Sequence, residues 1–143
     1  MNIKFKKLND KAVIPSKAHE YDAALDLIAV SKEINTMPRW GYIEYGTGLA
    51  VEIPNFCVGL IFPRSSISKT SNHLRNSVGV IDSGYRGEIK LRFSIDNSEN
   101  IEYDLYNKIG QLMIIELPRI NIIETKTLSE SPRGLGGFGS TGT

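Results

Sequence analysis

An all-β sandwich or barrel is the fold that this sequence predicts, and three observations lead to it. Thirteen glycines and six prolines interrupt the 143 residues, and the apolar runs between them are short and rich in β-branched side chains. These runs recur about every 8–12 residues, with turn residues between them. No segment sustains an apolar stripe of helical period over three turns. The expected strands lie at residues 3–5, 12–14, 48–53, 56–62, 78–81, 88–95, 112–115 and 121–124.

The clearest of these strands is 88–95, where apolar and polar side chains alternate without a break. Such alternation is typical of a strand with one face against a core. Prolines or an Asp-Ser-Gly turn end three of the other strands. The one helical signal is at 65–70, just after Pro63, and predicts one or two turns. In the 88–95 strand, Ile89, Leu91, Phe93 and Ile95 share the apolar face, and Glu88, Lys90, Arg92 and Ser94 share the polar face.

Composition excludes several classes of protein. Hydrophobic residues make up 41% and charged residues 23% of the chain, as in a single soluble globular domain. The net charge of +1 does not favour a protein that binds nucleic acid through bulk charge. No run approaches the roughly 18 apolar residues of a membrane span, and the N-terminus lacks the apolar core of a secretory signal.

The few cysteines and histidines point to a reducing compartment and against a zinc site. Cys57 is the one cysteine, so an internal disulfide is not possible, and the cytoplasm is the simplest location. His19 and His73 are the two histidines and lie far apart in the sequence. A zinc site of histidines and cysteines is therefore nearly excluded.

The C-terminal segment 131–143 differs from the rest of the chain. Five of its last ten residues are glycine, so it cannot bury enough surface to order itself alone. We expect a β domain at 1–130 followed by a flexible arm at 131–143. Arg133, Phe138 and the pair Ser140-Thr141 stand among the glycines at intervals that a ligand could use. The alternative is a solvated terminal segment without a ligand.

The segment Pro63-Arg-Ser-Ser66 follows an apolar strand and suits a phosphate group. Arg64 offers a planar fork of donors, and Ser65 and Ser66 add hydroxyl and backbone N–H groups. Taken alone, this segment is more simply explained as a surface turn with an N-cap serine.

Residues 76–88 are predicted to form a β-hairpin around the turn at 82–84. Asp82 follows the apolar pair Val80-Ile81, and its carboxylate could activate a water as a general base. Tyr85 could stack on a ring or a sugar, and Asn76 carries the donor and acceptor that match a pyrimidine edge. The alternative, that Asp82 is simply a turn former, is equally supported by the local sequence.

Two isolated polar residues lie in apolar surroundings. Gln111 stands at the start of an apolar strand, as an exposed edge residue or as a donor to ligand phosphate. Asp26 lies inside the apolar run 23–29, and a buried carboxylate needs a partner. Backbone N–H groups or an arginine could satisfy Asp26, or it could link through water to a hydrated Mg²⁺.

Five segments taken together, in this order, resemble the trimeric deoxyuridine triphosphate nucleotidohydrolases (dUTPases). They are Ala23-Ala-Leu-Asp-Leu27, Pro63-Arg-Ser-Ser66, residues 76–88, Ile109-Gly-Gln-Leu112, and the glycine-rich 133–142. The third and fifth are the most specific, and the resemblance covers residues from about 20 to 143. Departures from the usual pattern include Ala24, Ser66 and Gly84, and Tyr106-Asn-Lys in place of Gly-Asp-Arg.

This resemblance implies a fold, an assembly and a reaction. The fold is a distorted jelly-roll β-barrel, and the assembly is a homotrimer with three active sites shared between subunits. The reaction is that of a dUTP diphosphatase, in which dUTP and water give dUMP and pyrophosphate with Mg²⁺ as cofactor. It would limit uracil in DNA and supply dUMP for dTMP synthesis. No nucleic-acid or membrane partner is expected.

The resemblance also implies a role for each matching residue. Asp82 matches the base that activates the water, and Tyr85 matches the aromatic that packs on the deoxyribose. Asn76 and the backbone of Gly79, Val80 and Ile81 match the group that recognises uracil. Contacts to the phosphates fall to Arg64, Ser65, Ser66 and Gln111, with Asp26 linked to the metal through water. In the arm, Arg133 matches the γ-phosphate arginine, Phe138 the aromatic over uracil, and Gly139, Ser140 and Thr141 further phosphate contacts.

Three other functions remain open from the sequence alone. A dCTP deaminase has the same fold, but relies on a glutamate and a different pocket. A nucleotide-sensing interaction module could use the polar loop at 94–107 as a partner surface, and a structural jelly-roll subunit would have no turnover.

Overall fold

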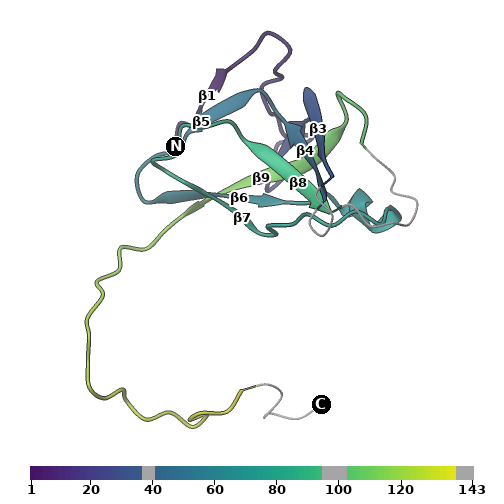
Figure 1. Ribbon diagram of the computed structural model, residues 1–143. Coiled ribbons are helices and arrows are strands. Elements are labelled where there is room, and N and C mark those ends of the chain that lie inside the picture. Colours follow the sequence, from purple (N-terminus) through teal and green to yellow (C-terminus); the bar gives the residue numbers. More distant parts are fainter. Residues whose placement is uncertain (37–40, 95–102, 138–143) are drawn as a thin grey trace.

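The computed structural model describes residues 1–36, 41–94 and 103–137, and almost all of its regular structure is β (Figure 1). The all-β class predicted from the sequence is therefore confirmed. The strands are β1 (Lys4–Lys7), β2 (Leu25–Ile28), β3 (Ser31–Asn35), β4 (Tyr42–Gly46), β5 (Leu49–Glu52), β6 (Cys57–Phe62), β7 (Gly79–Asp82), β8 (Lys90–Ser94) and β9 (Lys108–Glu116). The helix expected after Pro63 is a single 3₁₀ segment, η1 (Ser65–Lys69).

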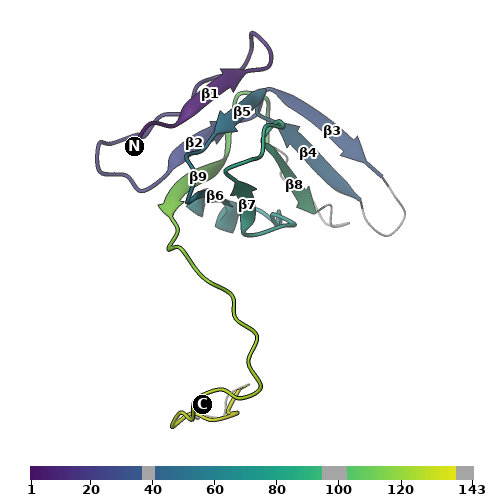
Figure 2. The ribbon, with the colours of Figure 1, turned by 90° about the vertical axis from the view of Figure 1, so that its left-hand side faces the viewer.

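The strands form three antiparallel sheets that surround one core (Figures 1 and 2). The sheets have the strand orders β1-β5, β2-β9-β6-β7 and β3-β4-β8. Side chains from all three sheets meet in one apolar cluster, which includes Leu27, Tyr45, Val51, Leu91 and Leu112. The described residues include no helix that is long and apolar enough to cross a membrane.

β8 has the alternation that the sequence predicted. Ile89, Leu91 and Phe93 are buried, whereas Lys90 and Arg92 are exposed. Ile95 lies outside the described residues. This face of β8 packs into the core, so its other face is free to carry charge.

Two predicted strands are wrong. Residues 12–14 lie in a loop and belong to no sheet of the described residues; Pro15, which has no backbone N–H to donate to a neighbouring strand, follows directly. Residues 121–124 pair with no strand among the described residues, and Ile122 is 89% exposed. The prediction missed β2, β3 and β4. β3 has no apolar alternation, because four of its five residues are exposed.

The predicted hairpin at 76–88 is also wrong in its pairing. β7 pairs with β6, and β8 pairs with β4, so the two strands belong to different sheets. The tight turn itself is present, because the N–H of Tyr85 donates to the carbonyl of Asp82 at 3.0 Å. This turn is a corner at which the chain passes from one sheet to the next.

After β9 the chain leaves the barrel (Figures 1 and 2). The N–H of Leu117 still donates to the carbonyl of Phe56 at 2.6 Å, and residues 121–134 are exposed. A local turn at 131–136 is closed by hydrogen bonds from Gly134 to Ser131 and from Gly136 to Arg133.

Candidate active site

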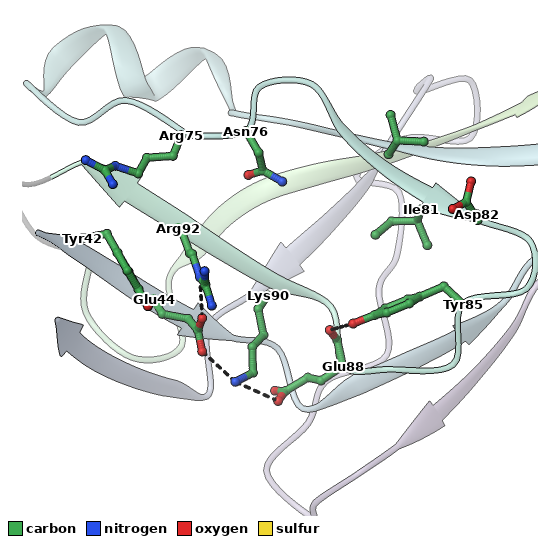
Figure 3. A pocket seen from close by; sticks show the side chains of 11 residues that line it. Tyr42, Glu44, Arg75, Asn76, Ile81, Asp82, Tyr85, Glu88, Lys90 and Arg92 are labelled. Atoms are coloured by element: carbon green, nitrogen blue, oxygen red, sulfur yellow. Dashed lines mark hydrogen bonds and ion pairs between the residues drawn. The ribbon is translucent and has the colours of Figure 1, made fainter. Parts of the chain in front are cut away.

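The corner after β7 borders a hollow in which five of the predicted residues come together (Figure 3). Asn76, Asp82 and Tyr85 all line it, and Val80 and Ile81 supply apolar wall between them. Figure 3 places Asp82 and Tyr85 at one end of the hollow and Tyr42 at the other. The local sequence thus brings a carboxylate, an aromatic ring and an amide to one cavity.

The position of Asp82 is compatible with both interpretations that the sequence left open. It ends β7 opposite Val58, and its backbone carbonyl accepts the hydrogen bond that closes the turn. Its side chain is exposed and lines the hollow. The backbone therefore serves the turn, while the carboxylate remains available to a water and a ligand.

Tyr85 is held in a defined position at the edge of the hollow. Its hydroxyl donates to the backbone carbonyl of Glu88 at 3.0 Å. The side chain of Glu88 in turn accepts a hydrogen bond from the N–H of Gly48 at 2.8 Å. Tyr85 is 43% exposed, so part of this residue is accessible to a ligand.

The opposite wall of this hollow is an ion-pair cluster built on Glu44. This carboxylate is 9% exposed and accepts from Lys90 Nζ at 2.6 Å and from Arg92 Nε at 2.7 Å. The hydrogen bond from Lys90 is the main reason that the pKa of Glu44 lies below its usual 4.5, although burial acts the other way. The same bonds raise the pKa of Lys90 and of Arg92. Arg92 also lies 4.6 Å from the centre of the Tyr42 ring.

A second hollow holds the predicted phosphate residues. Asp26, Arg64, Ser65 and Gln111 line it, and Ser66 lies next to them at the start of η1. Strand register explains the grouping. β9 lies between β2 and β6, and places Gln111 opposite Asp26 on one side and opposite Phe62 on the other.

Gln111 is therefore in a central strand, and its interpretation as an exposed edge residue is wrong. Its Nε2 donates to the carbonyl of Pro63 at 3.0 Å. This bond fixes the backbone just before Arg64. Gln111 therefore contributes to the second hollow in two ways: its side chain lines the hollow, and its hydrogen bond holds the turn at Pro63.

Asp26 has two cationic partners. Its Oδ1 accepts from Arg64 Nε at 3.0 Å, and its Oδ2 lies 2.7 Å from Lys108 Nζ. The carboxylate is 18% exposed, so this pairing offsets the cost of its burial. The bond uses only the Nε–H of Arg64, and a guanidinium has four further N–H donors.

The donor set bears on the predicted metal. Among the described residues, no three His, Cys, Asp or Glu side chains gather closely enough to hold a metal directly. Mg²⁺ commonly keeps several waters and takes few protein ligands. Asp26 lines the second hollow and is partly exposed, so it fits a contact through metal-bound water.

The arm residues are only partly described. Arg133 lies in the turn at 131–136, where its Nε donates to the carbonyl of Gly136 at 2.9 Å, and it lines neither hollow. Phe138, Gly139, Ser140 and Thr141 lie outside the described residues.

Sequence reasoning missed three charged residues that shape the two hollows. Lys108 occupies the place where the resemblance expects arginine. This departure from the family pattern was the only feature of the sequence that drew attention to Lys108. Glu44 carried the same signal as Asp26, a carboxylate between apolar and aromatic residues, but the sequence analysis did not use it. Glu88 lies on the polar face of the predicted 88–95 strand, but nothing in the sequence pointed to Gly48 as its partner.

Comparison with known proteins agrees with this geometry. The family model described as dUTPase matches residues 10–142. The chain is 40% identical over 143 residues to the deoxyuridine 5'-triphosphate nucleotidohydrolase of Clostridium acetobutylicum, covering 99% of this chain and 97% of that protein. It is 39% identical to the protein of the same name from Clostridioides difficile, covering 99% and 98%.

Solved structures share the fold. A variant of the dUTPase of Staphylococcus bacteriophage 80alpha, solved with dUpNHpp, superposes with a TM-score of 0.80 at 26% identity and covers 99% of both chains. A variant of the dUTPase from phage phi11 of S. aureus has a TM-score of 0.72 at 19% identity, and covers 89% of this chain and 98% of its own. The phi11 structure is described as having a structural Mg(II) ion. Because the two sequences are only 19% identical, their similarity shows a shared fold and nothing more.

Proposed function

We propose, from the premise that the chain belongs to the dUTPase family, that Asp82 is the general base of its reaction. The chain is a dUTP diphosphatase, which hydrolyses dUTP to dUMP and pyrophosphate. The observation that carries the assignment of Asp82 is its place in one hollow with Tyr85 and Asn76. A carboxylate at the end of a β-strand, exposed beside an apolar wall, can accept a proton from a water in the same cavity.

The reaction balances as a single displacement at phosphorus. One oxygen of Asp82 takes a proton from water as the water oxygen bonds to the α-phosphorus. The bond from the α-phosphorus to the oxygen that bridges to the β-phosphorus breaks, and pyrophosphate leaves with that oxygen. The proton on Asp82 then returns to solvent.

The same hollow supplies the recognition of deoxyuridine. Asn76 and the backbone of Gly79, Val80 and Ile81 would bind the uracil edge, because they offer donors and acceptors along one strand. The Tyr85 ring would pack on the deoxyribose and leave no room for a 2′-hydroxyl. Its hydrogen bond to Glu88 supports this role, because a ring held in place can exclude one extra oxygen.

The second hollow would hold the triphosphate. Arg64 would bind phosphate oxygens through the donors that Asp26 leaves open, with Ser65, Ser66 and Gln111 as further contacts. Asp26 would hold Mg²⁺ through its waters, and the ion, when bound, would neutralise charge on the phosphates.

Two observations support a homotrimer in which copies share each site. The two hollows have no lining residue in common, although the substrate needs the chemistry of both. Ile120, Ile122, Ile123 and Leu128 are between 75% and 89% exposed, and another copy would cover them. The arm of one copy would then close a site of others through Arg133, Phe138, Gly139, Ser140 and Thr141, and exclude water from it. The free and buried Cys57 fits a cytoplasmic location.

The test of this function is pyrophosphate release from dUTP, dTTP, dCTP and UTP, with Mg²⁺ and with a chelator. We expect rapid release from dUTP alone, lowered by the chelator. Ammonia release from dCTP would instead indicate the deaminase, and no turnover would favour a structural or sensing protein.

Asp82→Asn tests the base directly. A positioned base contributes about 10²–10⁴-fold, so single-turnover hydrolysis should fall at least about a hundredfold. Binding of dUTP should stay similar or tighten, because the neutral amide does not repel phosphate. Ser83→Ala is the control in the same turn. Near-normal turnover of Asp82→Asn would move the base elsewhere, with Asp26 the first alternative.

A further inference from the structure

We propose that Lys108 is a positioning residue that keeps the guanidinium group of Arg64 available to the triphosphate. It does so by occupying the second oxygen of Asp26, so that Asp26 holds Arg64 through one hydrogen bond only. This inference rests on the proposed role of Arg64 as a phosphate contact. It concerns a residue that lines neither hollow and so acts through Asp26.

Asp26 stands between two cations, and each of its oxygens has one of them. Oδ1 accepts from Arg64 Nε at 3.0 Å, and Oδ2 lies 2.7 Å from Lys108 Nζ. The Asp26 side chain is 18% exposed, whereas that of Lys108 is 45% exposed. Asp26 and Arg64 line the second hollow, and Lys108 approaches the same carboxylate from outside that lining.

A carboxylate and a guanidinium group favour a different arrangement when nothing else holds them. They frequently form two parallel hydrogen bonds, one to each oxygen. The torsion that turns an aspartate carboxylate is broad, so the partners of Asp26 decide which way its oxygens face. With Lys108 on Oδ2, the bond between Arg64 and Asp26 uses Nε alone. The Nη groups of Arg64 are then left for phosphate oxygens.

A shift in strand register brings Lys108 to this carboxylate. β2 and β9 run side by side, and Asp26 lies opposite Gln111 (Figure 2). Two residues further along β2, Ile28 lies opposite Lys108, after the shift. Lys108 and Gln111 are three residues apart, so strict alternation would place them on opposite faces of β9. A β-bulge re-aims a side chain, and this one turns Lys108 toward the face that carries Asp26.

The start of β9 is held without the Lys108 side chain. The N–H of Ala29 donates to the carbonyl of Asn107 at 3.0 Å. The N–H of Tyr106 donates to the carbonyl of Ala29 at 2.7 Å. Replacement of the Lys108 side chain should therefore leave β9 in place, and change only what faces the second oxygen of Asp26.

The backbone of Arg64 is fixed in a separate way. Gln111 Nε2 donates to the carbonyl of Pro63 at 3.0 Å, and the N–H of Ile67 donates to the carbonyl of Arg64 at 3.0 Å. The Arg64 side chain, in contrast, is 34% exposed and bonds to Asp26. The side chain of Arg64 can therefore turn while its backbone stays where it is.

The expected consequence is confined to the phosphates. An Arg64 that forms two bonds with Asp26 gives up a second of its five N–H donors. Its guanidinium plane is then aligned with the Asp26 carboxylate instead of being free to turn toward the substrate. The triphosphate should bind more weakly, whereas the nucleoside, which is proposed to lie in the other hollow, should bind as before.

The experiment measures binding of a non-hydrolysable dUTP analogue and of deoxyuridine to full-length Lys108→Met. Methionine keeps an apolar stem but lacks the ammonium group. Affinity for the analogue should fall by about tenfold or more, the effect of one hydrogen bond to a charged group. Affinity for deoxyuridine should not change. The loss should appear both with Mg²⁺ and with a chelator, because the donor that is lost belongs to Arg64.

Lys17→Met is the matched control for charge. Lys17 precedes Ala18, which lines the same hollow, and its Nζ donates to the carbonyl of Glu20 at 3.4 Å. The control variant therefore loses the same charge near the hollow and leaves the partners of Asp26 unchanged. Its affinity for the analogue should stay close to that of the wild type.

An Asp26→Asn background separates positioning from attraction by charge. An amide has one acceptor oxygen, so it cannot form the pair of two bonds with Arg64. Lys108→Met should therefore cause little further loss in this background. If Lys108 attracts the phosphates directly, the loss should be as large there as in the wild type, and the proposal is wrong.

Three other results would overturn the proposal. One is unchanged affinity for the analogue in Lys108→Met. Another is an equal loss of affinity for the analogue and for deoxyuridine, which would assign Lys108 to the stability of the barrel. A Lys108→Met variant that does not fold would lead to the same conclusion.

Arg64→Ala separates this proposal from the one on which it rests. If Arg64→Ala binds the analogue as the wild type does, Arg64 is not a phosphate contact, and both proposals fail at that point. If affinity falls in Arg64→Ala but not in Lys108→Met, only the role of Lys108 is wrong.

Discussion

Glu44 is the residue whose protonation matters most for the charged wall of the first hollow. Glu44→Gln should lower the free energy of unfolding at pH 7 by about 1.5–3 kcal/mol, the usual range for hydrogen bonds to charged groups. Lys90 and Arg92 would then lie close together without their anion. Urea unfolding measures the change. Glu52→Gln is the control, because Glu52 pairs with Lys4 in an exposed position and should matter less.

The pH dependence of this effect has a definite sign. The pKa of Glu44 is lower in the folded protein than in the unfolded chain, so at acidic pH the unfolded chain binds the proton first. The stabilisation is complete above about pH 4.5 and is lost as the pH falls through the lowered pKa. The difference between wild type and Glu44→Gln should therefore shrink below pH 4.5. A difference that stays constant into acid would mean that charge is not its cause.

Tyr106 has a φ of 68°, a left-handed conformation that a bulky side chain adopts at a cost. Tyr106→Gly relieves this strain, whereas Tyr106→Ala keeps a Cβ. We expect the glycine variant to be more stable than the alanine variant by about 1 kcal/mol, the reverse of the usual order. Thermal unfolding of the two variants measures the difference, and equal stability would contradict the strain.

At the residue scale, the sequence predicted the groups of the first hollow because chemistry and order coincide in one segment. Asn76, Asp82 and Tyr85 lie within ten residues of one another. Glu44 and Gly48 could not be predicted in the same way, because their partners Lys90 and Glu88 are brought to them by pairing between distant strands.

At the scale of elements, the arm after residue 131 carries the clearest prediction. Removal of residues 132–143 should leave the midpoint of thermal unfolding unchanged, because the described part of the arm makes no bond to the barrel in this chain. Turnover of dUTP should fall strongly, because closure over the substrate would be lost. Calorimetry measures the thermal stability and steady-state kinetics measures the turnover of dUTP, both on the same sample. Equal losses in both would make the arm structural.

Strands were predictable where one face is buried and the other is solvated. β8 alternates for this reason, and so its burial pattern followed from the sequence. β3 has no such alternation, and the corner at 83–84 has the sequence of a hairpin turn although its strands join different sheets. Pairing of β8 with β4 is a long-range choice that local residues do not specify.

At the scale of the whole molecule, the separation of the two hollows makes the shared site testable. Asp82→Asn and Arg133→Ala should each be inactive alone. If the base and the arm of one site come from different copies, random mixing by joint refolding should restore about a quarter of the sites. Light scattering on the mixture should give the mass of a trimer.

Control assemblies show which results would contradict a site shared between copies. Each variant refolded with wild type sets the scale for mixed assemblies. No recovery in the mixture, together with a trimeric mass, would place the base and the arm of each site in the same copy. An active monomer would contradict the trimer itself.

The central place of β9 has a consequence for synthesis on the ribosome. β2 and β6 are made early, yet both pair with β9, which comes near the end of the described chain. Until β9 leaves the exit tunnel, these earlier strands expose unpaired edges and apolar side chains to solvent. A nascent chain halted before residue 108 should therefore bind chaperones and be cut readily by proteases, and the Asp26–Gln111 pairing should be among the last contacts to form during translation.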